Sequence, residues 1–87
     1  MDDKLLIART LPENWQAEAY GSQWPGIWIL FPADRQGYAT IDLVNRTFSL
    51  GQMVPLRRRS LDPQFSGRNW KATLILAAVD ALRAALA

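Results

Sequence analysis

The fold of this chain is decided by residues 27–50, which read IWILFPADRQGYATIDLVNRTFSL. Ile27–Phe31 is apolar at every position, which is typical of a central strand covered on both sides. A polar loop at Pro32–Gly37 indicates a hairpin, and Tyr38–Leu43 then alternates apolar and polar residues. After a second polar turn, Thr47–Leu50 continues with apolar residues at every other position. The stretch therefore predicts an antiparallel meander.

The alternation also predicts which side chains share a face of the sheet, because successive residues of a strand point to opposite faces. In the second of these strands, Ala39 is expected to face the core and Tyr38 to face outward. In the first strand, Ile27 and Ile29 are expected to face the core, which turns Trp28 outward. Trp28 and Tyr38 are therefore predicted to lie together on an uncovered face.

The segments before this meander are also predicted to be rich in strands. Residues 4–11 (KLLIARTL) alternate loosely and favour a strand, although a short helix also fits them. Pro12 ends that segment. Trp15–Tyr20 alternates again and is predicted as a strand that Gly21 ends.

The C-terminal part of the chain is predicted as a basic loop at 52–66 and a helix at 67–86, with Ser66 as the N-cap. A short edge strand around Val54–Arg58 is an alternative within the loop. At 100° per residue, six apolar side chains of the helix fall within about 60° of one direction: Leu74, Ile75, Ala78, Leu82, Ala85 and Leu86. We therefore predict one small α+β domain, residues 1–87, in which an antiparallel meander of three to five strands carries one C-terminal helix on one face.

The composition excludes several kinds of chemistry. The 87 residues contain no Cys and no His. The chain therefore forms no disulfide, no zinc finger and no nucleophile–base pair that needs a Cys or His. No Gly-rich phosphate loop, serine nucleophile motif or cluster of metal ligands occurs, and the carboxylates are scattered along the chain. We expect a protein that is not an enzyme and that needs no cofactor and no metal.

The basic residues are concentrated in the second part of the chain. Residues 1–34 carry two basic and five acidic side chains, a net charge of −3, whereas residues 35–87 carry eight and three, a net charge of +5. The candidate anion-binding residues lie in the loop and at the start of the helix, whose first turn has no acidic residue: Arg57, Arg58, Arg59, Arg68 and Lys71. These residues predict weak, sequence-indifferent binding to nucleic acid or another polyanion. A solvated loop, or pairing of these groups with a carboxylate such as that of Asp62, is the alternative.

The aromatic residues suggest a second kind of site. The chain has four tryptophans, of which Trp15 and Trp70 are expected to fill the core. Trp28 and Tyr38, on the uncovered face, would either stack nucleic-acid bases or contact a partner protein or a second copy of the chain. Leu76 lies on the polar side of the helix and would matter only as part of such a contact. Salt dependence separates the two hypotheses, because phosphate contacts weaken steeply with salt.

Residues 67–82 begin with a glycine and continue with a lysine and a regular spacing of small and aliphatic residues: Lys71, Ala77, Ala78, Ala81 and Leu82. This spacing resembles the last helix of the double-stranded RNA-binding domain, in which Lys-Lys-x-Ala-Lys-x-x-Ala-Ala-x-x-Ala-Leu follows a Gly-containing loop. The chain departs from the family where two phosphate-contacting lysines and the first alanine are replaced: Trp70, Leu74 and Thr73. It also has no predicted N-terminal helix and more predicted strands.

The resemblance implies a sheet-and-helix arrangement with a positive helix start. Three-stranded DNA-binding domains of the integrase and plant AP2 type share that arrangement, so it does not choose between RNA and DNA. The sequence shows no signal peptide and no apolar run long enough to span a membrane, so a cytoplasmic protein without membrane contact is expected.

Overall fold

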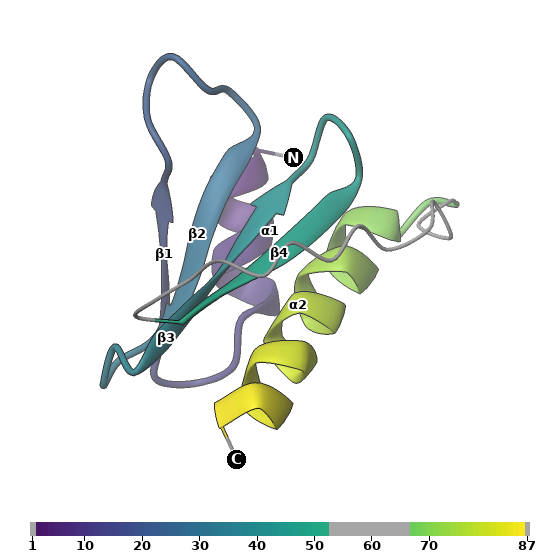
Figure 1. The fold of residues 1–87 in the computed structure, drawn as a ribbon. Coiled ribbons are helices and arrows are strands. Elements are labelled where there is room, and N and C mark those ends of the chain that lie inside the picture. The colour runs from purple at the N-terminus through teal and green to yellow at the C-terminus, as the bar shows by residue number, and fades with distance from the viewer. Residues whose placement is uncertain (1, 53–66, 87) are drawn as a thin grey trace.

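The computed structural model describes residues 2–52 and 67–86, which form an antiparallel sheet of four strands and two helices (Figure 1). The elements follow one another along the chain as α1 (Asp3–Thr10), β1 (Trp15–Ala19), β2 (Ile27–Pro32), β3 (Gly37–Asp42), β4 (Thr47–Gln52) and α2 (Trp70–Leu86). The strand order is β1-β2-β3-β4, so each strand pairs with the next one in sequence. The predicted α+β class, the meander and the C-terminal helix on one face are confirmed.

The register of the strands defines the face of the sheet that carries the core. Residues directly opposite each other in an antiparallel pair point to the same face. Leu30 lies opposite both Ala17 and Ala39, and Ala39 lies opposite Leu50. The neighbouring row on that face is built from larger side chains: Trp28, Ile41 and Phe48.

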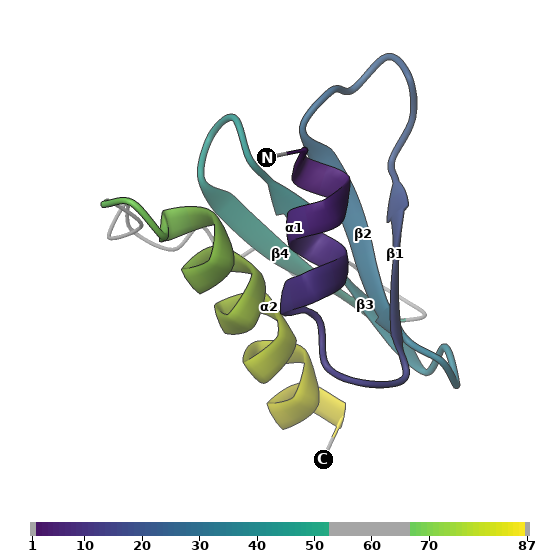
Figure 2. The same cartoon turned by 180° about the vertical axis from the view of Figure 1, so that it is seen from behind.

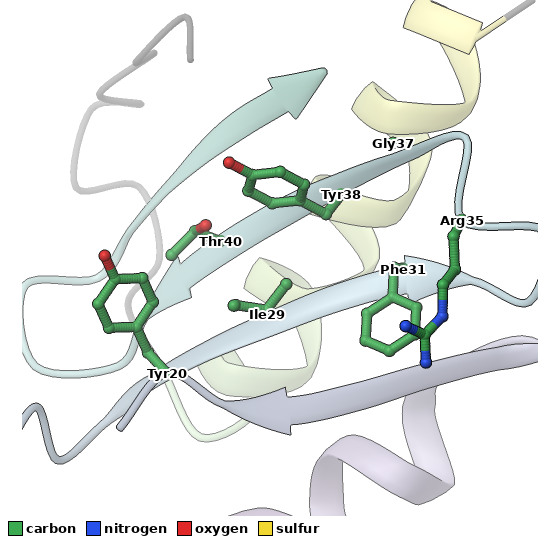
Figure 3. A pocket seen from close by; sticks show the side chains of 7 residues that line it. All are labelled: Tyr20, Ile29, Phe31, Arg35, Gly37, Tyr38 and Thr40. Carbon is green, nitrogen blue, oxygen red and sulfur yellow. The ribbon is translucent and has the colours of Figure 1, made fainter. Parts of the chain in front are cut away.

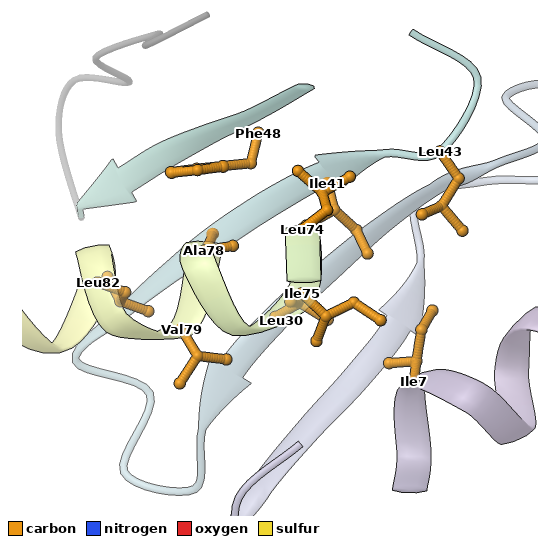
Figure 4. Close-up of a cluster of buried hydrophobic side chains, with 11 residues drawn as sticks. Ile7, Leu30, Ile41, Leu43, Phe48, Leu74, Ile75, Ala78, Val79 and Leu82 are labelled. Carbon is orange, nitrogen blue, oxygen red and sulfur yellow. The ribbon is translucent and has the colours of Figure 1, made fainter. Parts of the chain in front are cut away.

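Both helices lie on this face, as Figure 2 shows from behind. α2 packs against β3 and β4, and α1 packs against α2 and β1. The largest side chains with almost no exposed surface come from α1, from the sheet and from α2 (Figure 4): Ile7, Leu30, Ile41, Leu74, Ile75, Val79 and Leu82. Burying one Leu or Ile side chain stabilises a fold by about 1.5–3 kcal/mol, so these residues hold the helices on the sheet.

The N-terminal segment is a helix, and the strand favoured for residues 4–11 is wrong. Asp2 caps the helix, because its Oδ1 accepts a hydrogen bond from the backbone N–H of Lys4 at 3.2 Å. Ile7 of α1 and its C-cap residue Leu11 are four residues apart and reach the core together, whereas Leu5 is 57% exposed. The loose alternation that suggested a strand is the three-to-four-residue spacing of a short amphipathic helix.

The apolar stripe predicted for the C-terminal helix is largely confirmed. Leu74, Ile75, Ala78 and Leu82 are buried and Leu86 packs on the core, whereas Ala85 is exposed.

The helix itself begins at Trp70, three residues later than predicted. Gly67 has φ +100°, a left-handed conformation that cannot belong to a right-handed helix. The predicted N-cap, most of the predicted basic loop and the alternative strand lie outside the described residues: Ser66, 53–66 and Val54–Arg58.

Candidate functional site

The face of the sheet opposite the helices is not covered by any element within residues 2–52 and 67–86 (Figures 1 and 2). This uncovered face contains a hollow of about 230 Å³. Aromatic, aliphatic and polar side chains from β2, β3 and the neighbouring loops line it (Figure 3): Tyr20, Ile29, Phe31, Arg35, Gly37, Tyr38 and Thr40. We refer to these residues as the aromatic hollow.

The strand register places the floor and walls of the aromatic hollow. Ile29 lies directly opposite Thr40, so both side chains project from the uncovered face. Figure 3 shows Ile29 between the rings of Tyr20, Tyr38 and Phe31. Tyr20 follows β1, is held by a hydrogen bond from its backbone N–H to the Ile27 carbonyl at 2.9 Å, and is 54% exposed. The result is an apolar floor with two phenol groups around it.

Arg35 closes one end of the aromatic hollow. Its guanidinium carbon lies 5.0 Å from the centre of the Phe31 ring, and the Phe31 side chain is only 6% exposed although it faces away from the helices. The Arg35 backbone has φ +55° and its N–H donates to the Pro32 carbonyl at 2.9 Å, which makes the hairpin tight. No carboxylate among the described residues pairs with Arg35. One cation therefore stands at the edge of an apolar surface.

The predicted aromatic pair on the uncovered face is half wrong. Tyr38 lies on that face as expected, but Trp28 lies opposite Ile41 and packs against the core on the helix side. The side chains of Ile27 and Ile29 point away from the core instead. Because every residue of the strand is apolar, the pattern carries no signal for which alternate set faces the helices, and the prediction chose the wrong set.

The basic residues at the start of α2 form a second group. The first turn of α2 contains no acidic residue, as predicted. However, Lys71 Nζ lies 2.8 Å from Asp3 Oδ1, so the first turn of α1 supplies a carboxylate to this group, and the suggested Asp62 lies outside the described residues. Arg68 is exposed two residues before the helix begins. A partly exposed ion pair of this kind adds little stability, about 0–1 kcal/mol, but it neutralises one of the predicted anion-binding charges.

Arg46 is a member of this group that sequence reasoning missed. It lies in the β3–β4 turn with φ +57°, and its guanidinium carbon is 4.3 Å from the centre of the Trp70 ring. Lys71 Nζ lies 5.7 Å from the same ring. Arg46 lies in the second polar turn that the sequence predicts, before Thr47–Leu50, and only the fold shows that this turn reaches the start of α2. The predicted Arg57, Arg58 and Arg59 lie outside the described residues.

A carboxylate organises that turn. Asp42 Oδ1 accepts hydrogen bonds from the backbone N–H groups of Val44 at 2.9 Å and Asn45 at 3.0 Å, and Asp42 Oδ2 accepts one from the Asn45 side chain at 2.9 Å. Burial raises the pKa of Asp42, but these hydrogen bonds lower the pKa more, so it lies below its ordinary value of 3.8. Asp42 is therefore charged at neutral pH, and it projects from the uncovered face opposite Ile27.

The predictions for the other two core tryptophans and for Leu76 agree with the fold. Trp15 and Trp70 pack against the core, and Leu76 is exposed on α2.

Comparisons with protein-family models, curated proteins and solved structures find no match. Among the described helices, none combines the length and apolar character needed to cross a membrane. The described part of the chain contains no group of three or more acidic residues that could hold a metal ion.

Proposed function

We propose that this chain is a non-enzymatic binding module that docks a partner protein on the uncovered face of its sheet. The observation that carries the proposal is the aromatic hollow, which lies on a face that both described helices leave free. Tyr, Phe and Arg are enriched at protein–protein interfaces, and the hollow combines all three residue types. The described lining residues offer apolar contact, hydroxyl groups and the Arg35 cation, and these groups suit binding to a protein surface.

The charges of the uncovered face favour a protein partner over a phosphate chain. Glu18 lies opposite Ile29 and Asp42 lies opposite Ile27, so both carboxylates project from the same face as the aromatic hollow. Among the described residues, Arg35 is the one cation that lines it. Counting the described residues, a polyanion laid along this face would meet two carboxylates and one guanidinium, whereas an uncharged or mixed protein surface would not be repelled.

The proposal is tested with peptides selected from a random display library on the wild-type protein. We expect the selected peptides to shift the amide resonances of Ile29, Tyr38 and Thr40, and Tyr38→Ala to weaken their binding by about tenfold or more, since buried tyrosines dominate many interfaces. Leu76→Ala is the matched control on the polar side of α2 and should leave binding unchanged. Peptides that bind Tyr38→Ala as well as wild type, or shift resonances only in the helices, would contradict the proposal.

Nucleic-acid binding is the second candidate function. Arg46, Arg68 and Lys71 gather at the start of α2, where no acid occupies the first turn. α1 also supplies an N-terminal helix, whose apparent absence was one departure from the double-stranded RNA-binding domain. The partial neutralisation of Lys71 by Asp3 makes this candidate the weaker of the two.

A fluorescence titration of duplex RNA and DNA at several salt concentrations tests this second candidate. If three or four basic groups reach phosphates, log K should fall with log salt at a slope of roughly −3 to −4, with a Kd of about 10⁻⁴–10⁻⁶ M. Arg68→Gln should flatten the slope by about 0.9, and replacing Arg57, Arg58 and Arg59 by Gln should flatten it further. Arg83→Gln, in the last turn of α2, is the control. Absence of binding at about 50 mM salt rules this candidate out.

A further inference from the structure

We infer that the aromatic hollow receives a single apolar or aromatic side chain of the partner protein, with an adjacent carboxylate of that partner bound by Arg35. This inference rests on the proposed function and names the chemistry of the segment that would be recognised. It depends on the size of the hollow, on the state of Arg35 and on the distribution of charge along the uncovered face.

The size of the hollow suits one side chain. Its volume is about 230 Å³, and it opens to solvent on the sheet surface. Sites for whole small molecules are larger, about 300–1,000 Å³, and enclose most of the ligand. A side chain delivered by a protein segment needs only a shallow site, because the rest of the segment lies on the surrounding face. Ile29 and Phe31 give that side chain an apolar floor, and the rings of Tyr20 and Tyr38 give it walls.

Arg35 is held in a position to bind a carboxylate. Its guanidinium carbon lies over the Phe31 ring, 5.0 Å from the ring centre, which is cation–π range. The N–H donors lie in the plane of a guanidinium and match the two oxygens of a carboxylate. Within the described residues, no Asp or Glu takes these donors. The left-handed backbone of Arg35, φ +55°, is a conformation that Gly adopts more readily, so the hairpin does not need an arginine there.

The charge of the uncovered face is polarised along the strands. Arg35 lies in the β2–β3 hairpin, beyond Phe31. Asp42 lies at the other end of β3, opposite the first residue of β2, and Glu18 lies opposite Ile29. A partner segment therefore fits best with one carboxylate at the Arg35 end and with neutral or basic residues at the Asp42 end. A run of acidic residues would be repelled by Glu18 and Asp42.

The test uses capped peptides that carry Glu-Phe, Gln-Phe or Glu-Ala in an otherwise identical Gly/Lys context, with affinities measured from amide shifts of Ile29, Tyr38 and Thr40. We expect the Glu-Phe peptide to bind about tenfold more tightly than either of the other two. Arg35→Gly should weaken the Glu-Phe peptide by about tenfold and leave the Gln-Phe peptide almost unaffected. The losses of affinity caused by Arg35→Gly in the protein and by Gln for Glu in the peptide should not add, because both changes remove the same contact.

Arg46→Gly is the matched control, since Arg46 shares the left-handed backbone and the stacking on an aromatic ring but lies at the Trp70 side. It should not change peptide affinity. The melting temperature of Arg35→Gly should stay close to that of wild type, because Gly suits φ +55°.

Equal binding of Glu-Phe and Gln-Phe, or additive effects of the two changes, overturns the inference while leaving the proposed function standing. Binding of library-selected peptides elsewhere on the molecule overturns both. Two further results also overturn the inference: salt-sensitive shifts of the hollow residues by a single-stranded oligonucleotide, and concentration-dependent shifts of the same residues without peptide, which indicate a second copy.

Discussion

Leu82→Ala is expected to lower the free energy of unfolding by about 2–5 kcal/mol. Leu82 has no exposed surface and belongs to the cluster that joins α2 to the sheet (Figure 4). Alanine would remove apolar contacts and leave a cavity that the surrounding strands can only partly fill. A small domain has about 5–15 kcal/mol of stability in total, so the loss should be visible as a large shift of the urea midpoint followed by tryptophan fluorescence.

Leu76→Ala is the control for this prediction, because it makes the same chemical change in the same helix. The Leu76 side chain is 46% exposed and lies on the polar side of α2. Its replacement should change stability by no more than about 0.5 kcal/mol. Equal destabilisation by the two variants would contradict the orientation of the helix on the sheet.

The orientation of α2 could be predicted because its sequence has only one apolar stripe. Leu74, Ala78 and Leu82 recur at four-residue spacing, while Thr73, Asp80 and Arg83 are polar and exposed. A helix with this pattern has a single way to bury its apolar surface. The third strand was equally clear, since Tyr38–Leu43 alternates without a break.

The orientation of β2 could not be predicted, because apolar residues at every position indicate a central strand but do not show which alternate side chains face the helices. Ile27–Phe31 is apolar on both sides, and a shift by one residue exchanges the two sets of side chains. The register with β3 resolves this, since Trp28 lies opposite the buried Ile41. One half of the candidate site, Tyr38, was therefore found from sequence and the other half was assigned to the wrong face.

The other members of the aromatic hollow needed tertiary structure. The sequence places Arg35 in a hairpin loop, but nothing in the loop sequence indicates its left-handed backbone or the approach of its guanidinium to the Phe31 ring. Likewise, Lys71 and Asp3 are 68 residues apart in sequence and form an ion pair because α1 lies beside α2. Contacts between distant elements have no local signal in the sequence.

The strand predicted at residues 4–11 shows that a short segment can match both the two-residue period of a strand and the 3.6-residue period of a helix. Leu5, Ile7 and Leu11 fit a loose alternation, while Ile7 and Leu11 alone fit one face of a helix. The signal that favours the helix is at its start, where Asp2 caps the backbone and Asp3 is acidic in the first turn.

The two alternatives for this segment predict different results for one pair of substitutions. Ile7 is 1% exposed and is the only residue of α1 that is buried, so Ile7→Ala should destabilise the fold by about 2–5 kcal/mol. Leu5 is 57% exposed, so Leu5→Ala should change stability by no more than about 0.5 kcal/mol. A strand that pointed Leu5 and Ile7 to the same side would make the two losses similar. Urea unfolding of both variants, compared at equal m-value, decides between these outcomes, and a comparable loss in both would contradict the helix.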